Sequence, residues 1–475
     1  MLLRTTLLLL ICLHLSSCSR HSQAVQPPNE KPFPAGAPMA DFIQFNYSVY
    51  LVPGRIGGPQ SLKLCNHLLR TRYKALKWVD GIPDHPTHLT DPLVSIHLER
   101  NVPKNYAPPT VDSLQYRGVG LSPGEQNALQ KSREAIILQF AHSKDHVWSS
   151  LLSATQLAED VARQSGGFIF DEGTRQIFTP DAWHKKRLAS WNSTAPELAT
   201  QFSIDLYPNG DYMRAVTLGL DKFGLPDVVV REVPQSSGAQ AESLINIFAQ
   251  TIAEGAMFSG SGKLKIDIHS LKNDQLRNSE LKSMNEHALG TACLFLTPAT
   301  PDEGDPENRL VELSAALYSG PDSLARQENM FSSLFGSEDV AHNVEETEEL
   351  LAESRRERAK LPALHQAFDA GLQAGEYIQV KAPFKSDRGT EWMWVEISRW
   401  KGRNITGTLQ NDPVDVPSLH AGQIVKVNAD EVFDYLRTYP DGHSEGNTTA
   451  KILERVESNP RKAPDHTEMP DCNSR

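Results

Sequence analysis

The segment YIQVKAPFKSDRGTEWMWVEISRWKGRNITGTLQ, at residues 377–410, decides the fold of the last part of the chain. It is typical of three short strands, because β-branched and aromatic residues alternate with turn-forming residues near Gly389 and Gly402. Just before it, apolar residues recur at helical spacing over residues 361–372. Sequential strands with short turns pair antiparallel, so residues 361–455 are predicted to form a small curled antiparallel sheet capped by a helix.

Upstream of this unit, strand and helix patterns alternate and predict two mixed α+β units, at residues 42–195 and 196–336. In the first unit, apolar residues alternate as in a strand over residues 45–51, and helical spacing runs from 62 to 79 and from 148 to 164. The predicted fold class is therefore α+β and multi-domain: two mixed α+β units followed by the small sheet.

The amino terminus, MLLRTTLLLLICLHLSSC, predicts a signal peptide at residues 1–17. Its end, Leu15-Ser16-Ser17-Cys18, resembles the lipobox of bacterial lipoproteins, which implies cleavage before Cys18 and lipidation of its thiol. Ser19 follows where an Asp would favour the inner membrane, so the resemblance implies an outer-membrane anchor facing the periplasm. The alternative is an ordinary cleaved signal. Residues 18–41 are Pro-rich and are predicted to carry the lipid and form a flexible tether.

The formal net charge of −12 argues against a nucleic-acid partner, because such proteins need basic surface to displace phosphate counterions. Acidic and then basic residues at 337–360 predict a charged, solvated helical linker. The polar residues 456–475 predict a disordered tail. Outside the signal and Cys18, three cysteines remain, an odd number that forms no disulfide framework. Whether any two of Cys65, Cys293 and Cys472 pair is left open; apolar surroundings favour buried thiols for the first two.

Five motifs in the last unit occur in order over about seventy residues. They are VKAPF at 380–384, EWMWV at 391–395, GTLQNDP at 407–413, AGQ at 421–423 and FDY at 433–435. With them the segment resembles the YegJ-like bacterial domain of unknown function. That family has no established activity, so the resemblance implies no catalytic residues.

The strand around Trp392 separates its residues into two faces. Trp392, Trp394 and Glu396 point one way, and Lys381 is expected nearby, so these four residues form a candidate binding surface. The alternative is a second core face covered by the helix at 361–372.

No catalytic residue is predicted. The chain has no GxSxG elbow, and the HSKDH segment containing His142 and His146 lacks the Glu of a zinc-protease motif. No metal site and no cofactor are predicted either. The leading hypothesis is a non-catalytic, lipid-anchored envelope protein that binds an unidentified envelope protein or ligand. The alternatives are a periplasmic hydrolase with a site assembled from distant residues and a purely structural envelope spacer.

Overall fold

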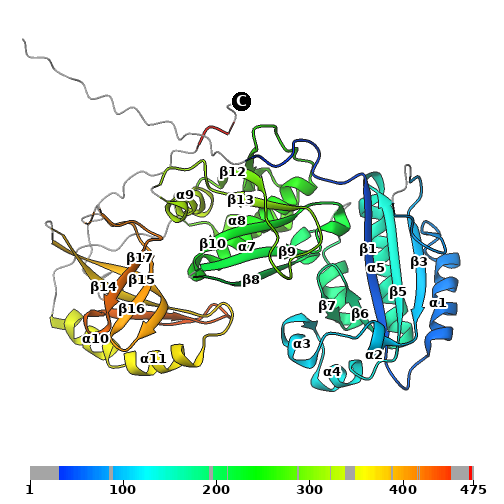
Figure 1. Cartoon of the computed structure of the whole chain (residues 1–475), viewed down its shortest axis with the longest axis horizontal. Coiled ribbons are helices and arrows are strands. Elements are labelled where there is room, and N and C mark those ends of the chain that lie inside the picture. The colour runs from blue at the N-terminus through cyan, green and yellow to red at the C-terminus, as the bar shows by residue number, and fades with distance from the viewer. Residues whose placement is uncertain are drawn as a thin grey trace, which may run out of the picture.

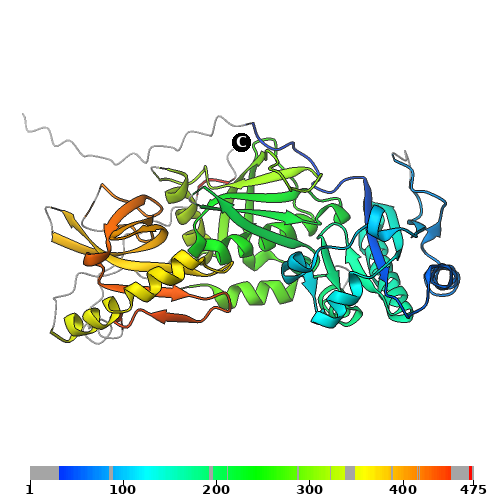
Figure 2. The ribbon, with the colours of Figure 1, turned by 60° about the horizontal axis from the view of Figure 1, so that its bottom comes forward.

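The computed structural model describes residues 31–84, 89–191, 196–210, 212–285, 288–320, 322–336, 348–386, 389–413, 416, 418–450 and 470–472. It confirms a multi-domain α+β fold with three sheets, arranged in a row along the longest axis of the molecule (Figure 1). The same row is seen after a turn of the view (Figure 2). The signal peptide and Cys18 lie outside the described residues.

The first unit is built on a seven-stranded mixed sheet in the order β2-β3-β5-β1-β6-β7-β4. Its strands are β1 (Phe42–Leu51), β2 (Lys77–Trp78), β3 (Leu93–Glu99), β4 (Gly118–Val119), β5 (Glu134–Ser143), β6 (Phe168–Asp171) and β7 (Gln176–Phe178). Its helices are α1 (Gly58–Thr71), α2 (Val102–Asn105), α3 (Val111–Arg117), α4 (Pro123–Leu129), α5 (Val147–Ser165) and α6 (Pro180–Trp183). Helices α1 and α5 pack together on one face of the central strands.

The long helix α5 ends where the sequence predicts. Gly166 adopts a left-handed conformation (φ 70°), and its N–H donates to the carbonyl of Ala162. Glycine takes this conformation at little cost, so it terminates the helix. The helix predicted over 62–79 is wrong in its second half: α1 ends at Thr71, and residues 77–78 form the edge strand β2. Leu76 lies in the loop between α1 and β2, and its side chain is buried. The apolar spacing of the sequence therefore extends beyond Thr71, where the helix ends.

The second unit is built on a six-stranded sheet in the order β11-β12-β13-β10-β9-β8. Its strands are β8 (Ser203–Asn209), β9 (Tyr212–Leu218), β10 (Asp227–Val233), β11 (Lys263–Asp267), β12 (Thr291–Pro298) and β13 (Leu310–Ser314), and its helices are α7 (Gly238–Ala253), α8 (Asp274–Ser283) and α9 (Ser323–Phe335). Strands β10 and β13 pair in parallel, whereas the other pairs are antiparallel. The sheet is therefore mixed.

The third unit is an antiparallel, open sheet in the order β17-β16-β15-β14-β18-β19. Its strands are β14 (Tyr377–Ser386), β15 (Gly389–Lys401), β16 (Asn404–Leu409), β17 (Ile424–Asn428), β18 (Asp434–Thr438) and β19 (Ser444–Gly446). Helix α11 (Leu361–Ala370) covers one face, where Leu361 and Leu364 pack with Val380, Met393 and Val395. The cap by a helix agrees with the predicted fold.

Helix α10 (Glu348–Arg358) lies within the segment predicted to be a solvated linker. The structure instead packs one side of it on the third sheet. The hydroxyl of Ser354 donates to the carbonyl of Phe433 at 2.6 Å, and Leu350 and Glu357 are buried. The charged residues of this segment indicate the exposed side of the helix, but they do not indicate the side that contacts the sheet. Residues 337–347 of the predicted linker lie outside the described residues.

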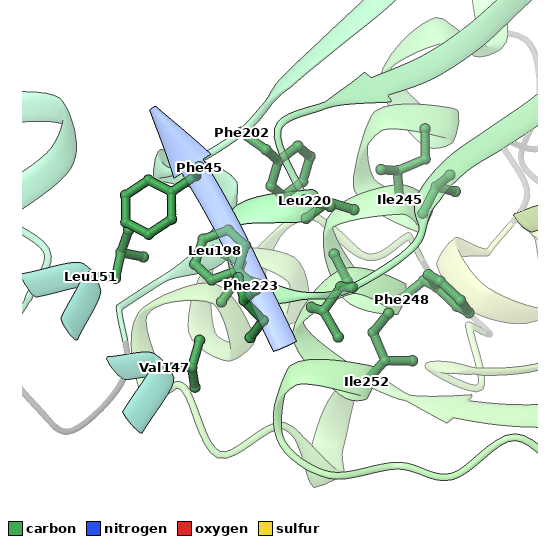
Figure 3. Close-up of a cluster of buried hydrophobic side chains, with 14 of the residues drawn as sticks. Phe45, Val147, Leu151, Leu198, Phe202, Leu220, Phe223, Ile245, Phe248 and Ile252 are labelled. Carbon is green, nitrogen blue, oxygen red and sulfur yellow. The ribbon is translucent and has the colours of Figure 1, made fainter. Parts of the chain in front are cut away.

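One continuous hydrophobic core joins the first and second units. Figure 3 shows Phe45 of β1 and Leu151 of α5 beside Leu198, Phe202 and Phe223 from the beginning of the second unit. All five side chains are buried. Packed apolar side chains from both units exclude water between them, so these two units share a core rather than meeting at a polar interface.

Buried ions cross the same junction. The ammonium of Lys222, from the second unit, donates to Asp171 at 2.8 Å, and the guanidinium of Arg187 donates to the same carboxylate at 3.0 Å. All three side chains are at most 1% exposed. Burial opposes ionisation of Asp171, but the charges of Lys222 and Arg187 outweigh it and hold the pKa of Asp171 below its usual value.

Residues 31–41 were predicted to belong to the flexible tether, but the structure packs them on the second unit. The N–H of Phe33 donates to the carbonyl of Leu296 at 2.8 Å, and the ring of Phe33 contacts Phe258 at 5.3 Å between centroids. The apolar Phe33 side chain explains the difference, because burying it against a second ring favours an ordered segment. The rest of the predicted tether, residues 18–30, lies outside the described residues.

A disulfide joins Cys293 of β12 to Cys472, with 5.7 Å between the Cα atoms and 179 residues of sequence separation. Cys65 is the remaining free cysteine among the described residues and is buried. The pairing shows that part of the tail predicted to be disordered is fixed to the second unit. None of the helices among the described residues has the length and apolar character that a bilayer crossing requires.

Candidate functional site

The four residues of the candidate binding surface lie on one face of the third sheet. Lys381 of β14 stands directly opposite Trp394 of β15, and its ammonium lies 5.8 Å from the indole ring, within the range of a cation–π interaction. Glu396 is two residues further along β15. This face is opposite to the one covered by α11, as the alternation of the strand predicts.

Most of this face is covered by other parts of the protein. The carboxylate of Glu396 accepts a hydrogen bond from the N–H of Ser236 in the second unit at 2.9 Å, and burial raises its pKa. The ring of Trp392 packs against Phe433 at 4.5 Å between centroids. Trp392 and Trp394 are half-buried, whereas Lys381 and Glu396 are buried. That this surface binds a partner stays a prediction, because Glu396 is bonded to the second unit and Trp392 packs on Phe433 of the same sheet.

A cleft of about 380 Å³ opens on the first unit. Its lining residues are Gln44, Phe45, Asn46, Ile82, Gln139, Phe140, Glu172, Gly173 and Asp221. Five of these nine residues carry a carboxylate or an amide in the side chain, and the volume lies within the usual range for small-ligand pockets. We call this feature the carboxylate cleft.

The alternation of the central strands places these amides. On β1, Phe45 and Tyr47 point into the core beneath α5, so Gln44 and Asn46 point to the opposite face of the sheet. Asn46 pairs with Gln139 of β5, which brings the two amides side by side. That face of the sheet therefore presents polar groups to the cleft.

Glu172 is held in place by three uncharged donors. Its carboxylate accepts hydrogen bonds from the amide of Asn46 at 2.9 Å, from the hydroxyl of Ser48 at 3.2 Å and from the hydroxyl of Tyr106. Burial, and then the charge of Glu172, raise the pKa of Tyr106, so its hydroxyl stays protonated and remains a donor. This shell orients Glu172 without neutralising it.

Asp221 reaches the cleft from the second unit. Its carboxylate accepts a hydrogen bond from the N–H of Lys222 at 2.8 Å. A Cβ atom at Gly173 would lie 3.2 Å from this carboxylate, so the turn at residues 171–173 and Asp221 are in close approach. Burial raises the pKa of Asp221, and the nearby Asp171 adds to the effect although Lys222 opposes it.

The arrangement can bind a polar or charged ligand, and its ionisable side chains are the two carboxylates of Glu172 and Asp221. None of the described residues that line the cleft is a Ser, Cys, His or Lys. His142 lies on β5 with its side chain buried, and His146 belongs to a short 3-10 helix, so these two residues do not share one helix. In the described part of the chain, no group of three or more His, Cys, Asp and Glu side chains could hold a metal ion.

Sequence reasoning missed the carboxylate cleft. Glu172 lies at the turn between β6 and β7, where a polar segment next to Gly173 is typical of a turn and not of a ligand site. The available signal was the pair of polar residues Gln44 and Asn46 in a strand whose other face is apolar. No signal in the sequence pointed to Asp221, which lies about fifty residues further along the chain.

Comparison with known proteins adds the identity of one unit. No curated protein and no solved structure matches the chain. Residues 366–468 match the model of the family DUF2314, described as an uncharacterized protein conserved in bacteria. The match covers helix α11 in part and strands β14 to β19 of the third sheet. The third unit thus contains a bacterial DUF2314 domain of unknown function.

Proposed function

We propose that the chain is a lipid-anchored bacterial envelope protein that binds a small ligand in the carboxylate cleft. The observation that carries the proposal is the cleft itself, which has a volume of about 380 Å³ and is lined by two carboxylates and three amides. The anchor is Cys18, and the predicted sorting places the protein at the outer membrane, facing the periplasm. We further propose that the third unit is YegJ-like and non-catalytic, on the strength of its five motifs.

The disulfide between Cys293 and Cys472 supports a location outside the cytoplasm. Stable disulfides form in oxidising compartments such as the periplasm and are rare where cellular thiols keep cysteines reduced. Residues 31–41 begin after the twelve residues that follow the predicted anchor, Cys18, and they pack on the second unit. A lipid on Cys18 would therefore hold the folded part close to the membrane, with only residues 19–30 between them.

The anchor is tested by mass spectrometry of the amino-terminal peptide. We expect a peptide that starts at Cys18 and carries acyl groups on its amine and thiol. A peptide with an unmodified Cys18 would remove the lipoprotein proposal, whereas ligand binding in the cleft would be unaffected.

Ligand binding is tested by native mass spectrometry of the full chain purified from envelopes. Gln139→Trp is designed to fill the cleft, and Asp112→Trp places the same side chain on an exposed position of α3 as a control. We expect a bound small molecule with wild type and with the Asp112 variant, but not with the Gln139 variant. Identical adducts in all three proteins would exclude the cleft as the binding site.

A further inference from the structure

The carboxylates of the cleft have no ion-pair partner in the described part of the chain. Neither Glu172 nor Asp221 forms a salt bridge there, and the contacts of Glu172 are to uncharged Asn46, Ser48 and Tyr106. The two nearest buried cations, Lys222 and Arg187, are both engaged by Asp171. A negative charge on Glu172 or Asp221 therefore has no ion-pair partner among the described residues.

Such a charge is costly unless a partner compensates it, because a half-buried carboxylate has lost part of its hydration. Burial raises the pKa of Asp221, and the charge of Lys222, whose ammonium is bonded to Asp171, only partly opposes that rise. A bound cation would supply that counter-ion. The site is therefore electrostatically complementary to a positive group and unfavourable to an anion.

The free acceptors define the kind of cation. A carboxylate offers about four acceptor positions, and three at Glu172 are taken by neutral donors, whereas Asp221 accepts a hydrogen bond from the N–H of Lys222. The amide nitrogen of Gln44 donates to the carbonyl of Pro83 at 3.0 Å, which leaves its oxygen available. One acceptor on Glu172, one on Asp221 and one amide oxygen match the three N–H donors of a primary ammonium ion.

We infer that the carboxylate cleft binds a small aliphatic amine through its primary ammonium group, held between Glu172 and Asp221. The inference rests on the proposed function and specifies the ligand of the same site. A bare metal ion fits less well, because a cleft of about 380 Å³ is far larger than an ion and the described residues offer no cluster of three metal-ligating side chains. The remaining volume accommodates the alkyl chain of the amine beside Ile82.

The test is isothermal titration calorimetry of the full chain, first stripped of any bound ligand, with three probes that share a five-carbon chain. The probes are 1,5-diaminopentane, 1,5-pentanediol and glutarate, which are cationic, neutral and anionic. We expect the diamine to bind at least tenfold more tightly than the other two, and its affinity to fall as salt is added. Glu172→Gln and Asp221→Asn should each weaken diamine binding at least tenfold, while keeping the shape of the side chain.

Asp112→Asn is the matched control, since it removes one negative charge from an exposed position in the same unit and should bind the diamine like wild type. Thermal unfolding of each variant checks that the fold is retained. Equal affinity for the diol, tighter binding of glutarate, no binding of any probe, or unchanged diamine binding in both cleft variants would overturn the inference. If the diol binds and Gln139→Trp abolishes its binding, the cleft remains a ligand site and only the amine specificity fails.

Discussion

Removing the disulfide between Cys293 and Cys472 should lower the free energy of unfolding substantially. The bond closes a loop of 179 residues that contains the whole third unit. In the chain-entropy model, opening a loop of this length costs about 5 kcal/mol of stability at 25 °C. Measured effects of native disulfides are about 2–5 kcal/mol, so we expect Cys472→Ser to fall within that range.

The variant at Cys472 is preferred to one at Cys293, because Cys293 is fully buried and its truncation would also disturb the core. Urea unfolding should shift to lower denaturant concentration in Cys472→Ser. Reductant should produce a similar shift in wild type and no further shift in the variant. The measurement is paired with alkylation of thiols in the unfolded chain, before and after reduction, followed by mass spectrometry of the peptides that contain these cysteines.

Two results would refute the reasoning. Alkylation of both cysteines without reductant would show that the bond does not form. A loss of stability below about 1 kcal/mol, with the bond shown to be present in wild type, would show that the tail segment contributes little to the closed loop.

Three further predictions concern buried charges. Lys222→Met leaves Asp171 partly uncompensated at the junction of two units, and the free energy of unfolding should fall by about 3–5 kcal/mol in urea unfolding. Glu396→Ala removes the acceptor for the N–H of Ser236 and should loosen the third unit by about 2 kcal/mol, measured as faster hydrogen exchange at Ser236. Burial, and then the charge of Asp221, raise the pKa of Asp227 from 3.8 to about 7. Between these values the folded state holds a proton that the unfolded state has lost, so this group lowers the free energy of unfolding as pH rises from about 4 to about 7, by at most about 4 kcal/mol. Urea unfolding of wild type and Asp227→Asn across this pH range isolates the effect.

Each of these predictions has a control and a contrary outcome. The control for Lys222→Met is Lys144→Met, which breaks a surface salt bridge with Asp41. This change should lower the free energy of unfolding by less than about 1 kcal/mol. Equal losses at both sites would show that the buried pair has no special role. Glu396→Gln keeps an acceptor oxygen and should protect Ser236 better than Glu396→Ala. A pH dependence that is the same in wild type and Asp227→Asn would mean that Asp227 is ionised throughout.

Periodicity predicted the long regular elements well. The strand β1 and the helix α5 lie where alternation and helical spacing place them. The short elements were missed, since strands of two to five residues such as β4 and β13 contain too few residues to show a period. The buried side chain of Leu76 caused the opposite error. Because Leu76 is apolar, the helical spacing of the sequence continues through a loop, and the predicted helix is too long.

The candidate site shows a different limit. The placement of Trp392, Trp394 and Glu396 on one face follows from the alternation of side chains along a single strand, so it can be predicted from the sequence. The carboxylate cleft depends on the approach of Asp221 to the turn at Glu172. That approach is set by how two units share a core, which no local pattern encodes.

The shared core also constrains how the chain can fold as it is made. Apolar contacts in one cluster link Phe33 and Phe45 to residues as distant as Phe335, so the first unit cannot complete its burial while the second is still missing. Contacts of such large sequence separation slow folding and leave apolar surface exposed in the meantime. A fragment that ends near residue 191 should therefore aggregate or bind chaperones, whereas a fragment that extends through α9 has all of this core. We therefore expect residues 31–335 to unfold in one cooperative transition, although they contain two sheets.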